Sequence, residues 1–426
     1  MAKGYQAPRG TQDILPPVSG QWHHLEDTFR QVCERYGYQE ARTPVFEEAA
    51  LFARGIGDAT DIVSKEMYVF EDRGGRSLSL RPEGTAGIAR AFVEHKLAGE
   101  KSAWKVFYLI SIFRYERPQA GRYRQAHQVG VECFGAGGPD VDAEIIALNM
   151  AWYRDLGMKG HELRLNSLGC PACRPGHRQA LTSALADVAE ELCPTCQGRL
   201  DTNPLRVFDC KSPSCGELVA NAPAPLDYLC DGCRSHFDAL RVLLDGMELP
   251  YEIDPRLVRG LDYYTRTAWE VKYAELGAQD ALCGGGRYDG LVEQLGGPKT
   301  PGIGFAAGIE RALVALEKGG ITMPETGAGG VMVIGLDEAS RQRSVLLAEE
   351  IRAHGLRAET DYFERGLKAQ MKQADRLGAR WAVMLGEEEM ASGEATVRDL
   401  MSGDQESVPL EGVAGWLGER VVTPAP

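Results

Sequence analysis

Residues 104–134 read WKVFYLISIFRYERPQAGRYRQAHQVGVECF, and they predict two strands joined by a loop that is rich in arginine. From Trp104 to Phe113 the segment consists mainly of Val, Phe, Tyr, Leu and Ile, which favour strands. Pro118 and Gly121 interrupt this pattern, and residues 125–134 then form the return strand. The segment therefore predicts a sheet of which this strand pair is a part.

The return strand has two unlike faces, because successive side chains of a strand point to opposite sides. One face carries Ala126, Gln128, Gly130 and Glu132, and the other carries His127, Val129, Val131 and Cys133. A purely structural strand gains nothing from burying Gln128 and Glu132 together unless a polar molecule lies on them. The first face is therefore expected to form the floor of a polar binding site.

Arginines and carboxylates recur in short runs joined by glycines, at residues 81–85 (RPEGT), 257–264 (LVRGLDYY) and 308–311 (GIER). The planar guanidinium of arginine forms paired hydrogen bonds with phosphate and keeps its charge. Arginines beside carboxylates that look buried suggest a site for a phosphorylated substrate and a small polar molecule. An enzyme that activates an amino acid with ATP requires such a site.

The bulk composition indicates an ordinary water-soluble protein of several domains. With 426 residues, 44% of them hydrophobic and 25% charged, we expect two to four domains. No run of 18 apolar residues occurs, and the N-terminus lacks an apolar signal core. We therefore expect no membrane span and a cytoplasmic location.

The net charge of −14 argues against a surface that is basic throughout, although nucleic acid needs only a local basic patch. Residues 105–124 contain five Lys or Arg and one acidic residue, Glu116. This segment fits either a contact with folded RNA or a solvated loop, and its charge does not decide between them.

The chain divides at changes of composition. Residues 1–325 are expected to form one domain, interrupted by a cysteine-rich insertion at 170–250. After a Pro- and Gly-containing linker, strands at 331–335, 357–362 and 381–385 alternate with helices at 339–354 and 367–377, which predicts a small α/β domain at 331–420. Residues 421–426 are expected to be a tail.

Near the N-terminus, Trp22, Leu25, Phe29, Val32 and Cys33 recur at helical spacing and predict a helix over residues 21–36. A strand is expected at 38–43, before Pro44. This helix is compatible with packing against a second subunit, but it would look much the same in a monomer.

Eight of the eleven cysteines lie between residues 170 and 233. They are Cys170, Cys173, Cys193, Cys196, Cys210, Cys215, Cys230 and Cys233, which form three CxxC pairs and one looser pair. In a reducing compartment this pattern indicates metal ligation before disulfides, and two pairs complete one structural zinc site. One or two zinc ions are predicted, with the combination of pairs left open, and unmetallated thiols are the alternative.

Taken together, the motifs resemble the histidyl-tRNA synthetase family of class II aminoacyl-tRNA synthetases over nearly the whole chain. The resemblance rests on residues 9–16 (RGTQDILP), the region around Pro44 (motif 1), 113–117 with the return strand (motif 2) and 302–311 (motif 3), and on two histidine-type motifs, 257–264 and 284–290 (GGGRYDG). The three numbered motifs by themselves indicate only the class, whereas the last two indicate the amino acid.

The resemblance implies an α+β catalytic domain, with an antiparallel sheet flanked by helices, and a C-terminal α/β anticodon-binding domain. It also implies a homodimer and a two-step ligase reaction. L-histidine and ATP, accompanied by Mg²⁺, would give histidyl-adenylate and pyrophosphate, and the histidine would then pass to the 3′-terminal adenosine of tRNA(His).

The resemblance also implies roles for individual residues. Arg114 would hold the α-phosphate, Arg122 and Arg311 the outer phosphates, and Arg259 both the α-phosphate and the histidine carboxylate, so that Arg259 and Arg114 are the catalytic candidates. The histidine pocket would comprise Glu83, Thr85, Gln128, Glu132, Tyr263, Tyr264 and Tyr288. We expect Glu83 at the amino group and Glu132 at the imidazole, although the reverse is compatible with the sequence.

The main alternative is a related protein that no longer charges tRNA, such as the regulatory subunit of ATP phosphoribosyltransferase, which would be expected to lack the C-terminal domain. A pure nucleic-acid-binding module has no use for the acids Glu83 and Glu132. Residues 302–307 (GIGFAA) also match a dinucleotide-binding fingerprint, but a loop precedes them where the fingerprint needs a strand. Their glycines are instead expected to bring a strand close to the adenosine.

Overall fold

The computed structural model describes residues 4–57, 60, 62–99, 103–119, 121–277, 280–323 and 329–420. The chain separates into two compact units, Met1–Met323 and Pro324–Pro426. Among the described residues, no helix combines the length and the apolar character that crossing a membrane requires.

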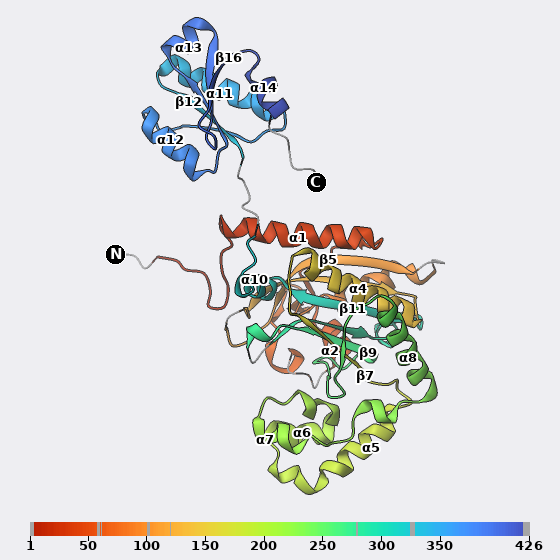
Figure 1. Cartoon of the computed structure of the whole chain (residues 1–426). Coiled ribbons are helices and arrows are strands. Elements are labelled where there is room, and N and C mark those ends of the chain that lie inside the picture. Colours follow the sequence, from red (N-terminus) through yellow and green to blue (C-terminus); the bar gives the residue numbers. More distant parts are fainter. Residues whose placement is uncertain are drawn as a thin grey trace. The chain divides into compact units, whose positions relative to one another are not determined.

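An eight-stranded sheet forms the centre of the first unit (Figure 1). Its strands, in spatial order, are β1 (Gln39–Glu40), β5 (Trp104–Phe113), β6 (Gln125–Phe134), β11 (Gly302–Gly308), β10 (Ala281–Arg287), β9 (Thr265–Lys272), β7 (Glu162–Ser167) and β8 (Glu252–Ile253). The six central strands run antiparallel, and only the two edge pairs are parallel. The antiparallel sheet that the resemblance implies is thus confirmed, and β5 and β6 have the bounds that the sequence predicts.

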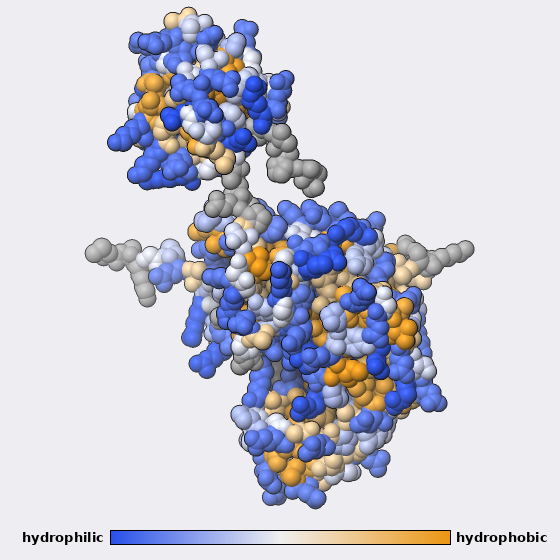
Figure 2. Space-filling view, viewed as in Figure 1, coloured by the Kyte–Doolittle hydropathy of each residue, from blue (hydrophilic) through white to orange (hydrophobic). Residues whose placement is uncertain are grey.

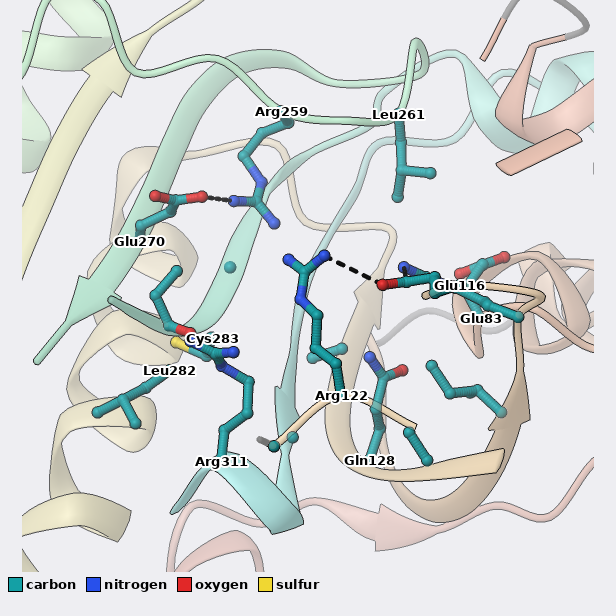
Figure 3. A pocket seen from close by; sticks show the side chains of 18 of the residues that line it. Glu83, Glu116, Arg122, Gln128, Arg259, Leu261, Glu270, Leu282, Cys283 and Arg311 are labelled. Atoms are coloured by element: carbon teal, nitrogen blue, oxygen red, sulfur yellow. Dashed lines mark hydrogen bonds and ion pairs between the residues drawn. The ribbon is translucent and has the colours of Figure 1, made fainter. Parts of the chain in front are cut away.

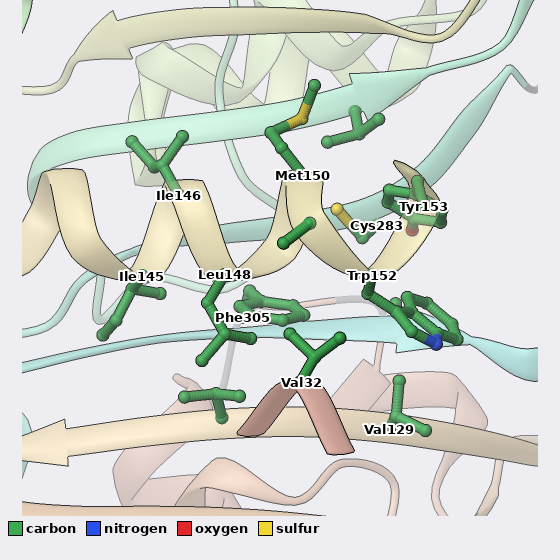
Figure 4. Packing of buried hydrophobic residues seen from close by; sticks show 14 of the residues in the cluster. Val32, Val129, Ile145, Ile146, Leu148, Met150, Trp152, Tyr153, Cys283 and Phe305 are labelled. Carbon is green, nitrogen blue, oxygen red and sulfur yellow. The ribbon is translucent and has the colours of Figure 1, made fainter. Parts of the chain in front are cut away.

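Helices cover one face of this sheet and form the main hydrophobic core. They are α1 (Val18–Arg35), α4 (Pro139–Asp155), α8 (Asp231–Gly246) and α10 (Ile309–Lys318). Figure 4 shows Leu148 and Trp152 of α4 pointing toward Phe305 and Val129 of the sheet. The apolar side chains of α1 are buried in this core of the chain itself.

The opposite face of the sheet carries the polar side chains. Around it lie α2 (Ala49–Ile56), α3 (Thr85–Glu94) and α9 (Leu291–Gln294), with a π-helical turn at Ile62–Glu66, a 3₁₀ turn at Leu97–Gly99 and a second core cluster. A small antiparallel sheet, in the order β2 (Phe46–Glu48), β4 (Ser77–Leu80) and β3 (Val69–Glu71), lies next to them in the chain.

The predicted strand at 38–43 is much shorter in the structure. Only Gln39 and Glu40 pair with β5, and the pairing ends with the Ala41 amide donating to the carbonyl of Phe107 (2.8 Å). Beyond Pro44 the chain enters the small sheet as β2, so it leaves the edge of the large sheet after two residues.

The cysteine-rich insertion is helical. It contains α5 (Arg174–Leu185), α6 (Pro194–Thr202), α7 (Pro213–Leu218) and 3₁₀ turns at Ala186–Glu191, Pro204–Asp209 and Pro225–Tyr228. α5, α6 and α7 form a lobe below the sheet in Figure 1. The following helix α8 differs, because its Phe237, Leu240 and Leu244 are buried in the main core with α4.

The second unit has a five-stranded sheet in the order β13 (Ala358–Thr360), β12 (Val331–Gly335), β14 (Trp381–Leu385), β15 (Glu394–Asp399) and β16 (Gln405–Pro409). Its helices are α11 (Glu338–Ala353), α12 (Leu367–Arg376), α13 (Glu387–Ser392) and α14 (Val413–Arg420). The predicted α/β alternation holds through β14, with bounds within two residues. The sequence interpretation misses the antiparallel strands β15 and β16, of which β16 lies at the edge of the sheet and buries one side chain.

The surfaces of the two units differ in Figure 2. The second unit is largely hydrophilic on the visible face, whereas apolar side chains gather on the first unit where α4 and α8 lie in Figure 1. On and after α8 the exposed apolar residues are Val242, Met247 and Ile253.

Candidate active site

A cavity of about 490 Å³ lies on the polar face of the large sheet. Its walls come from β6, β9, β10 and β11, from the loop of residues 257–264, and from the loop between β5 and β6. Of the predicted site residues it is lined by Glu83, Thr85, Arg114, Arg122, Gln128, Arg259, Tyr263, Tyr264 and Arg311. Residues more than 200 positions apart are thus brought together, and the volume is in the usual range for a small-molecule site.

Four arginines reach the cavity from different elements. Figure 3 shows Arg122, Arg259 and Arg311 directed into it from separate sides. Glu116 lies between two of them, at 3.0 Å from Nη1 of Arg122 and 3.7 Å from Nη1 of Arg114. Nε of Arg311 donates to the carbonyl of Ala281 (2.6 Å), which directs this side chain across the end of β10. Burial and then the nearby charge of Arg122 lower the pKa of Arg311.

Arg259 is held by a partner that the sequence does not reveal. Its guanidinium forms an ion pair with Glu270 of β9, whereas Asp262 accepts a hydrogen bond from Asn203 instead (2.8 Å). Gly284 makes room for this guanidinium, because a Cβ atom there would lie 1.8 Å from Nη2. The glycine of the 284–290 motif therefore has a steric role in placing Arg259.

Glu83 caps the N-terminus of α3. Its carboxylate accepts hydrogen bonds from the amides of Thr85 (2.6 Å) and Ala86 (2.7 Å) while it also lines the cavity. Burial raises the pKa of Glu83, and the two amides partly oppose this shift. The cap fixes the direction of the carboxylate, so that its remaining lone pairs face the cavity.

Glu132 and Tyr288 are not among the residues that line the cavity, but Glu132 is hydrogen-bonded to Thr85, which does line it. The Glu132 carboxylate is fully buried and accepts hydrogen bonds from the hydroxyls of Thr85 (2.7 Å), Tyr108 (3.0 Å) and Tyr288. Burial raises the pKa of Glu132 to about 8, although the hydroxyl partners oppose the shift. Thr85 links this buried layer to the cavity.

Gln128 lies on the floor of the cavity and has an unsatisfied acceptor. Its Oε1 is buried and has no hydrogen-bond partner among the described residues. Buried polar atoms in folded proteins are nearly always paired, so an orphan in a cavity indicates a polar ligand. Tyr263 and Tyr264 line the cavity beside it, with ring centroids 4.7 Å apart.

The glycines of residues 302–307 lie inside strand β11, so the strand-turn-helix geometry of a dinucleotide fingerprint is absent at this described segment. The space beside them is filled by the protein itself. A Cβ atom at Gly302 would meet the Tyr288 ring at 2.4 Å, and one at Gly304 would meet the Glu132 carboxylate at 1.9 Å. These two glycines therefore make room for the side chains of Tyr288 and Glu132.

The insertion also reaches the cavity, which the sequence interpretation misses. Residues 208–211, with Asp209, Cys210 and Lys211 among them, form part of its wall. No local pattern in the sequence announces this contact, because it depends on how the insertion folds back on the sheet. Glu116 and Glu270 were likewise missed as partners of the arginines.

The eight predicted metal ligands form two separate groups. One group is Cys170, Cys173, Cys230 and Cys233, and the other is Cys193, Cys196, Cys210 and Cys215. Within each group the four sulfur atoms lie within 4.8 Å of one another. The structure thus combines the first CxxC with the last, and the second with the looser pair.

The cavity can bind two chemically different groups side by side. The arginines provide fixed positive charge on one side, and Figure 3 shows Glu83 and Gln128 together on another. A polyphosphate would neutralise the arginines, while an amine or imidazole would meet the acceptors. Water would be largely displaced from such a site, which strengthens each of these interactions.

Comparisons with known proteins agree with this geometry. The family model of histidyl-tRNA synthetase matches residues 10–172 and 219–312, and that of the anticodon binding domain matches residues 330–420. A histidine–tRNA ligase of Moorella thermoacetica is 54% identical over 409 residues, which are 96% of this chain and 97% of the relative. The ligase of Halothermothrix orenii is 51% identical over 405 residues, covering 95% and 97%.

Solved structures give the same result. The apo histidyl-tRNA synthetase of S. aureus has a TM-score of 0.84 and 38% sequence identity, and the match covers 97% of this chain and 100% of that one. A protein from Bacillus halodurans C, described as an ATP phosphoribosyltransferase regulatory subunit/histidyl-tRNA synthetase, has a TM-score of 0.67 at 20% identity. The second match shows only that the fold is shared.

Proposed function

The chain belongs to the histidyl-tRNA synthetase family, and we propose that the cavity on its large sheet is where histidine and ATP react. The activity is that of the near-full-length relatives, histidine–tRNA ligation, rather than that of a regulatory subunit. The observation that carries the proposal for the cavity is the convergence of Arg114, Arg122, Arg259 and Arg311 beside Glu83 and Gln128.

In the first step a carboxylate oxygen of histidine attacks the α-phosphorus of ATP, and pyrophosphate leaves. Both reactants are negative, so the barrier contains electrostatic repulsion as well as the cost of positioning. Arg259 and Arg114, which enter from the loop of residues 257–264 and from the end of β5, are assigned to the α-phosphate as the family resemblance implies. Arg122 and Arg311 are assigned to the outer phosphates.

Glu270 and Glu116 keep these cations in place before ATP arrives. Glu270 pairs with Arg259, and Glu116 lies between Arg114 and Arg122. A guanidinium that is already oriented needs little rearrangement when charge develops on the phosphate. Both carboxylates are therefore positioning residues that act through the arginines.

Histidine is assigned to the part of the cavity near α3. The Glu83 carboxylate is placed to accept from its amino group, and Gln128 offers the unpaired oxygen. Tyr263, Tyr264 and Thr85 line the same region, while Glu132 and Tyr288 back it. Glu132, with its raised pKa, is assigned to the imidazole end, which it reaches directly on a ligand-induced shift or through Thr85. A neutral imidazole offers one donor and one acceptor, and these groups can satisfy both.

Magnesium is proposed to accompany ATP. Glu116 and Glu310 line the cavity beside the arginines of the outer phosphates, and carboxylate oxygens are ligands that Mg²⁺ accepts. When bound, the ion would neutralise charge on the phosphates. Its place depends on the nucleotide, so the chain alone defines only the nearby oxygen donors.

The second unit is proposed to bind the anticodon of tRNA(His). After the carboxyl end of β13, Tyr362 and Phe363 are 69% and 74% exposed, and the guanidinium of Arg365 lies 5.1 Å from the Phe363 ring. Exposed aromatic rings beside arginine are suited to stacking on unpaired bases, worth about 1–3 kcal/mol per base. We expect Tyr362→Ala with Phe363→Ala to weaken tRNA binding and leave pyrophosphate exchange unchanged, with Met401→Ala as the matched exposed control.

A homodimer is proposed on the small sheet. Phe46, Val69 and Phe70 are between 41% and 54% exposed there, and Val45 beside them is 44% exposed. Adjacent exposed apolar residues of this kind mark an interface more often than an isolated one does. The interface thus lies on the segment that follows Pro44, while the apolar face of α1 is already buried within the chain. A cytoplasmic location fits the eleven unpaired cysteines.

The decisive experiment is amino-acid-dependent exchange of pyrophosphate into ATP, with histidine run beside other amino acids. We expect exchange with histidine alone, because a site built on hydrogen bonds to imidazole rejects analogues that lack them by about 10⁴–10⁵. Exchange with another amino acid, or ATP binding without any histidine-dependent exchange, would contradict the proposed site.

A further inference from the structure

The insertion holds eight cysteines in two groups, which we name the first set (Cys170, Cys173, Cys230, Cys233) and the second set (Cys193, Cys196, Cys210, Cys215). The family model of histidyl-tRNA synthetase does not match residues 173–218, so family membership assigns no role to most of this segment. The sets must therefore be judged from their own geometry.

The distances between sulfur atoms are those of a zinc tetrahedron. Sγ of Cys170 lies 3.6 Å from that of Cys173 and 3.9 Å from that of Cys230, and in the second set Cys193 and Cys210 are 3.8 Å apart. Zn–S bonds of about 2.3 Å in tetrahedral geometry place neighbouring sulfurs about 3.8 Å apart. A disulfide would require about 2.05 Å, and all eight residues are free cysteines.

Backbone amides point at the sulfurs, as they do around thiolates. The Cys230 amide donates to Sγ of Cys173 (3.1 Å), and the Cys193 amide donates to Sγ of Cys215 (3.2 Å). The Ser212 amide similarly approaches Sγ of Cys210 (3.5 Å). Such donors stabilise the negative charge of metal-bound sulfur and orient the ligand.

The part of the insertion that precedes α8 has only a small apolar core. Its own core contains Leu181, Leu185, Leu192, Val207 and Val219, and the remaining buried members of that cluster, Cys196 and Cys215, belong to the second set. A segment with so few buried apolar side chains commonly depends on metal ions for its fold.

Contacts from the insertion hold the loop that carries Arg259, Tyr263 and Tyr264. Asn203, which links α6 to the 3₁₀ turn Pro204–Asp209, donates to the Asp262 carboxylate at 2.8 Å. Asn203 lies between the two cysteine pairs of the second set in the sequence, because Cys196 is in α6 and Cys210 follows the 3₁₀ turn. Arg174, next to Cys173 of the first set, donates to the carbonyl of Tyr264.

We propose that the insertion carries two separate Cys₄ zinc sites, and that the two ions hold Asn203 and Arg174 where these residues position the histidine-binding loop. Zinc here has no place in the reaction. It fixes one wall of the cavity, to which residues 208–211 also belong. The positioning of the histidine-binding loop by Asn203 and Arg174 rests on the proposed function, whereas the predicted zinc content does not.

The metal content is tested on the full chain, purified without chelator, by elemental analysis and native mass spectrometry. We expect two zinc ions per chain, and one in each of the double variants Cys230→Ser with Cys233→Ser and Cys193→Ser with Cys196→Ser. Ala172→Ser and Ser214→Ala, which lie within or beside the same ligand runs and keep every thiolate, should retain both ions. One zinc ion or none in the wild-type chain would overturn the two-site proposal. A mass measured under denaturing conditions that is lower than the sequence mass, by the hydrogens that disulfide formation removes, would also overturn it.

The positioning part is tested without touching a ligand. Asn203→Ala should keep both zinc ions and raise the KM for histidine by about tenfold, the equivalent of one hydrogen bond to a charged group. Thr202→Ala is the matched control, since among the described residues the Thr202 hydroxyl donates only to the Gly198 carbonyl in the same helix α6 (3.0 Å). An unchanged histidine KM in Asn203→Ala, with metal content intact, would refute the positioning role and leave the ligase activity unaffected.

Discussion

The two faces of strand β6 give the clearest comparison in this protein. Val129, Val131 and Cys133 point into the main core and are fully buried. Gln128 points to the cavity with an unpaired oxygen, and Glu132 is buried with a raised pKa. One strand thus provides stability on one side and an unsatisfied, binding-competent surface on the other.

The difference shows how this fold separates stability from function. Apolar burial on the helix face is favourable without a ligand. The cavity face keeps cations close together, an orphan amide oxygen and a buried carboxyl, all of which are unfavourable until substrate arrives. Substitutions on the two faces should therefore affect different measurements.

The largest effect is expected on the helix face. Phe29 of α1 is fully buried and contacts the rings of Trp152, Phe107 and Phe305, with centroids 5.4–6.3 Å apart. Phe29→Ala should reduce the free energy of unfolding by about 3–5 kcal/mol, measured by chemical denaturation. Where the variant remains folded, its KM for histidine should equal that of the wild type. A changed KM would break the separation of the two faces.

The next largest effect is expected for an arginine of the cavity. Arg259→Ala should lower the rate of histidine-dependent pyrophosphate exchange by about 10²–10³, because a fixed transition-state donor is lost. Arg256→Ala is the matched control, since Arg256 is exposed three positions earlier in the same segment. A near-normal exchange rate in Arg259→Ala would remove this arginine from the reaction.

The titration of Glu132 should make the free energy of unfolding depend on pH. Its pKa is about 8 in the folded chain, against an ordinary value of 4.5, so the folded state binds more protons than the unfolded state between these pH values. Stability from this group is therefore complete below about pH 4.5 and decreases as the pH rises toward 8, by on the order of 1 kcal/mol per pH unit. Glu132→Gln should lose this dependence when unfolding is measured across the same pH range. An identical pH profile in both proteins would show that Glu132 is not perturbed.

The smallest effect is expected at Gln128. Gln128→Met keeps the size of the side chain and removes an unsatisfied buried oxygen, so the unfolding free energy should stay constant or rise slightly. The KM for histidine should rise several-fold, since a hydrogen bond of about 0.5–1.5 kcal/mol is lost. Pyrophosphate exchange at varied histidine concentrations measures this KM. A variant that is less stable but binds histidine normally would reverse the assignment of this face.

Much of the fold could be predicted from the sequence wherever periodicity was strong. β5, β6, β12 and β14 have the expected bounds, because each is a continuous or alternating apolar run. The helices of the insertion, helices α13 and α14, strand β15 and the edge strand β16 were not predicted. They are short, and most of them bury few side chains, so contacts distant in the sequence determine them.

The residues of the candidate site could likewise be predicted only in part from the sequence. The motifs selected nine residues that do line the cavity, and they also selected Glu132 and Tyr288, which lie behind it. The partners Glu270 and Glu116, and the contact of the insertion with the cavity, depend on the fold. An ion pair between strands has no signature in either strand alone.

The order of residue types along the chain determined which strands form, which face of β6 is polar, and which cysteines can bind metal, because these properties follow from local periodicity and side-chain chemistry. Only the tertiary structure decided which cysteine pairs meet, which acid holds Arg259, and that Glu132 is buried against the Thr85 hydroxyl. Such facts depend on distances between segments far apart in the chain, and burial sets the strength of the charges that meet there.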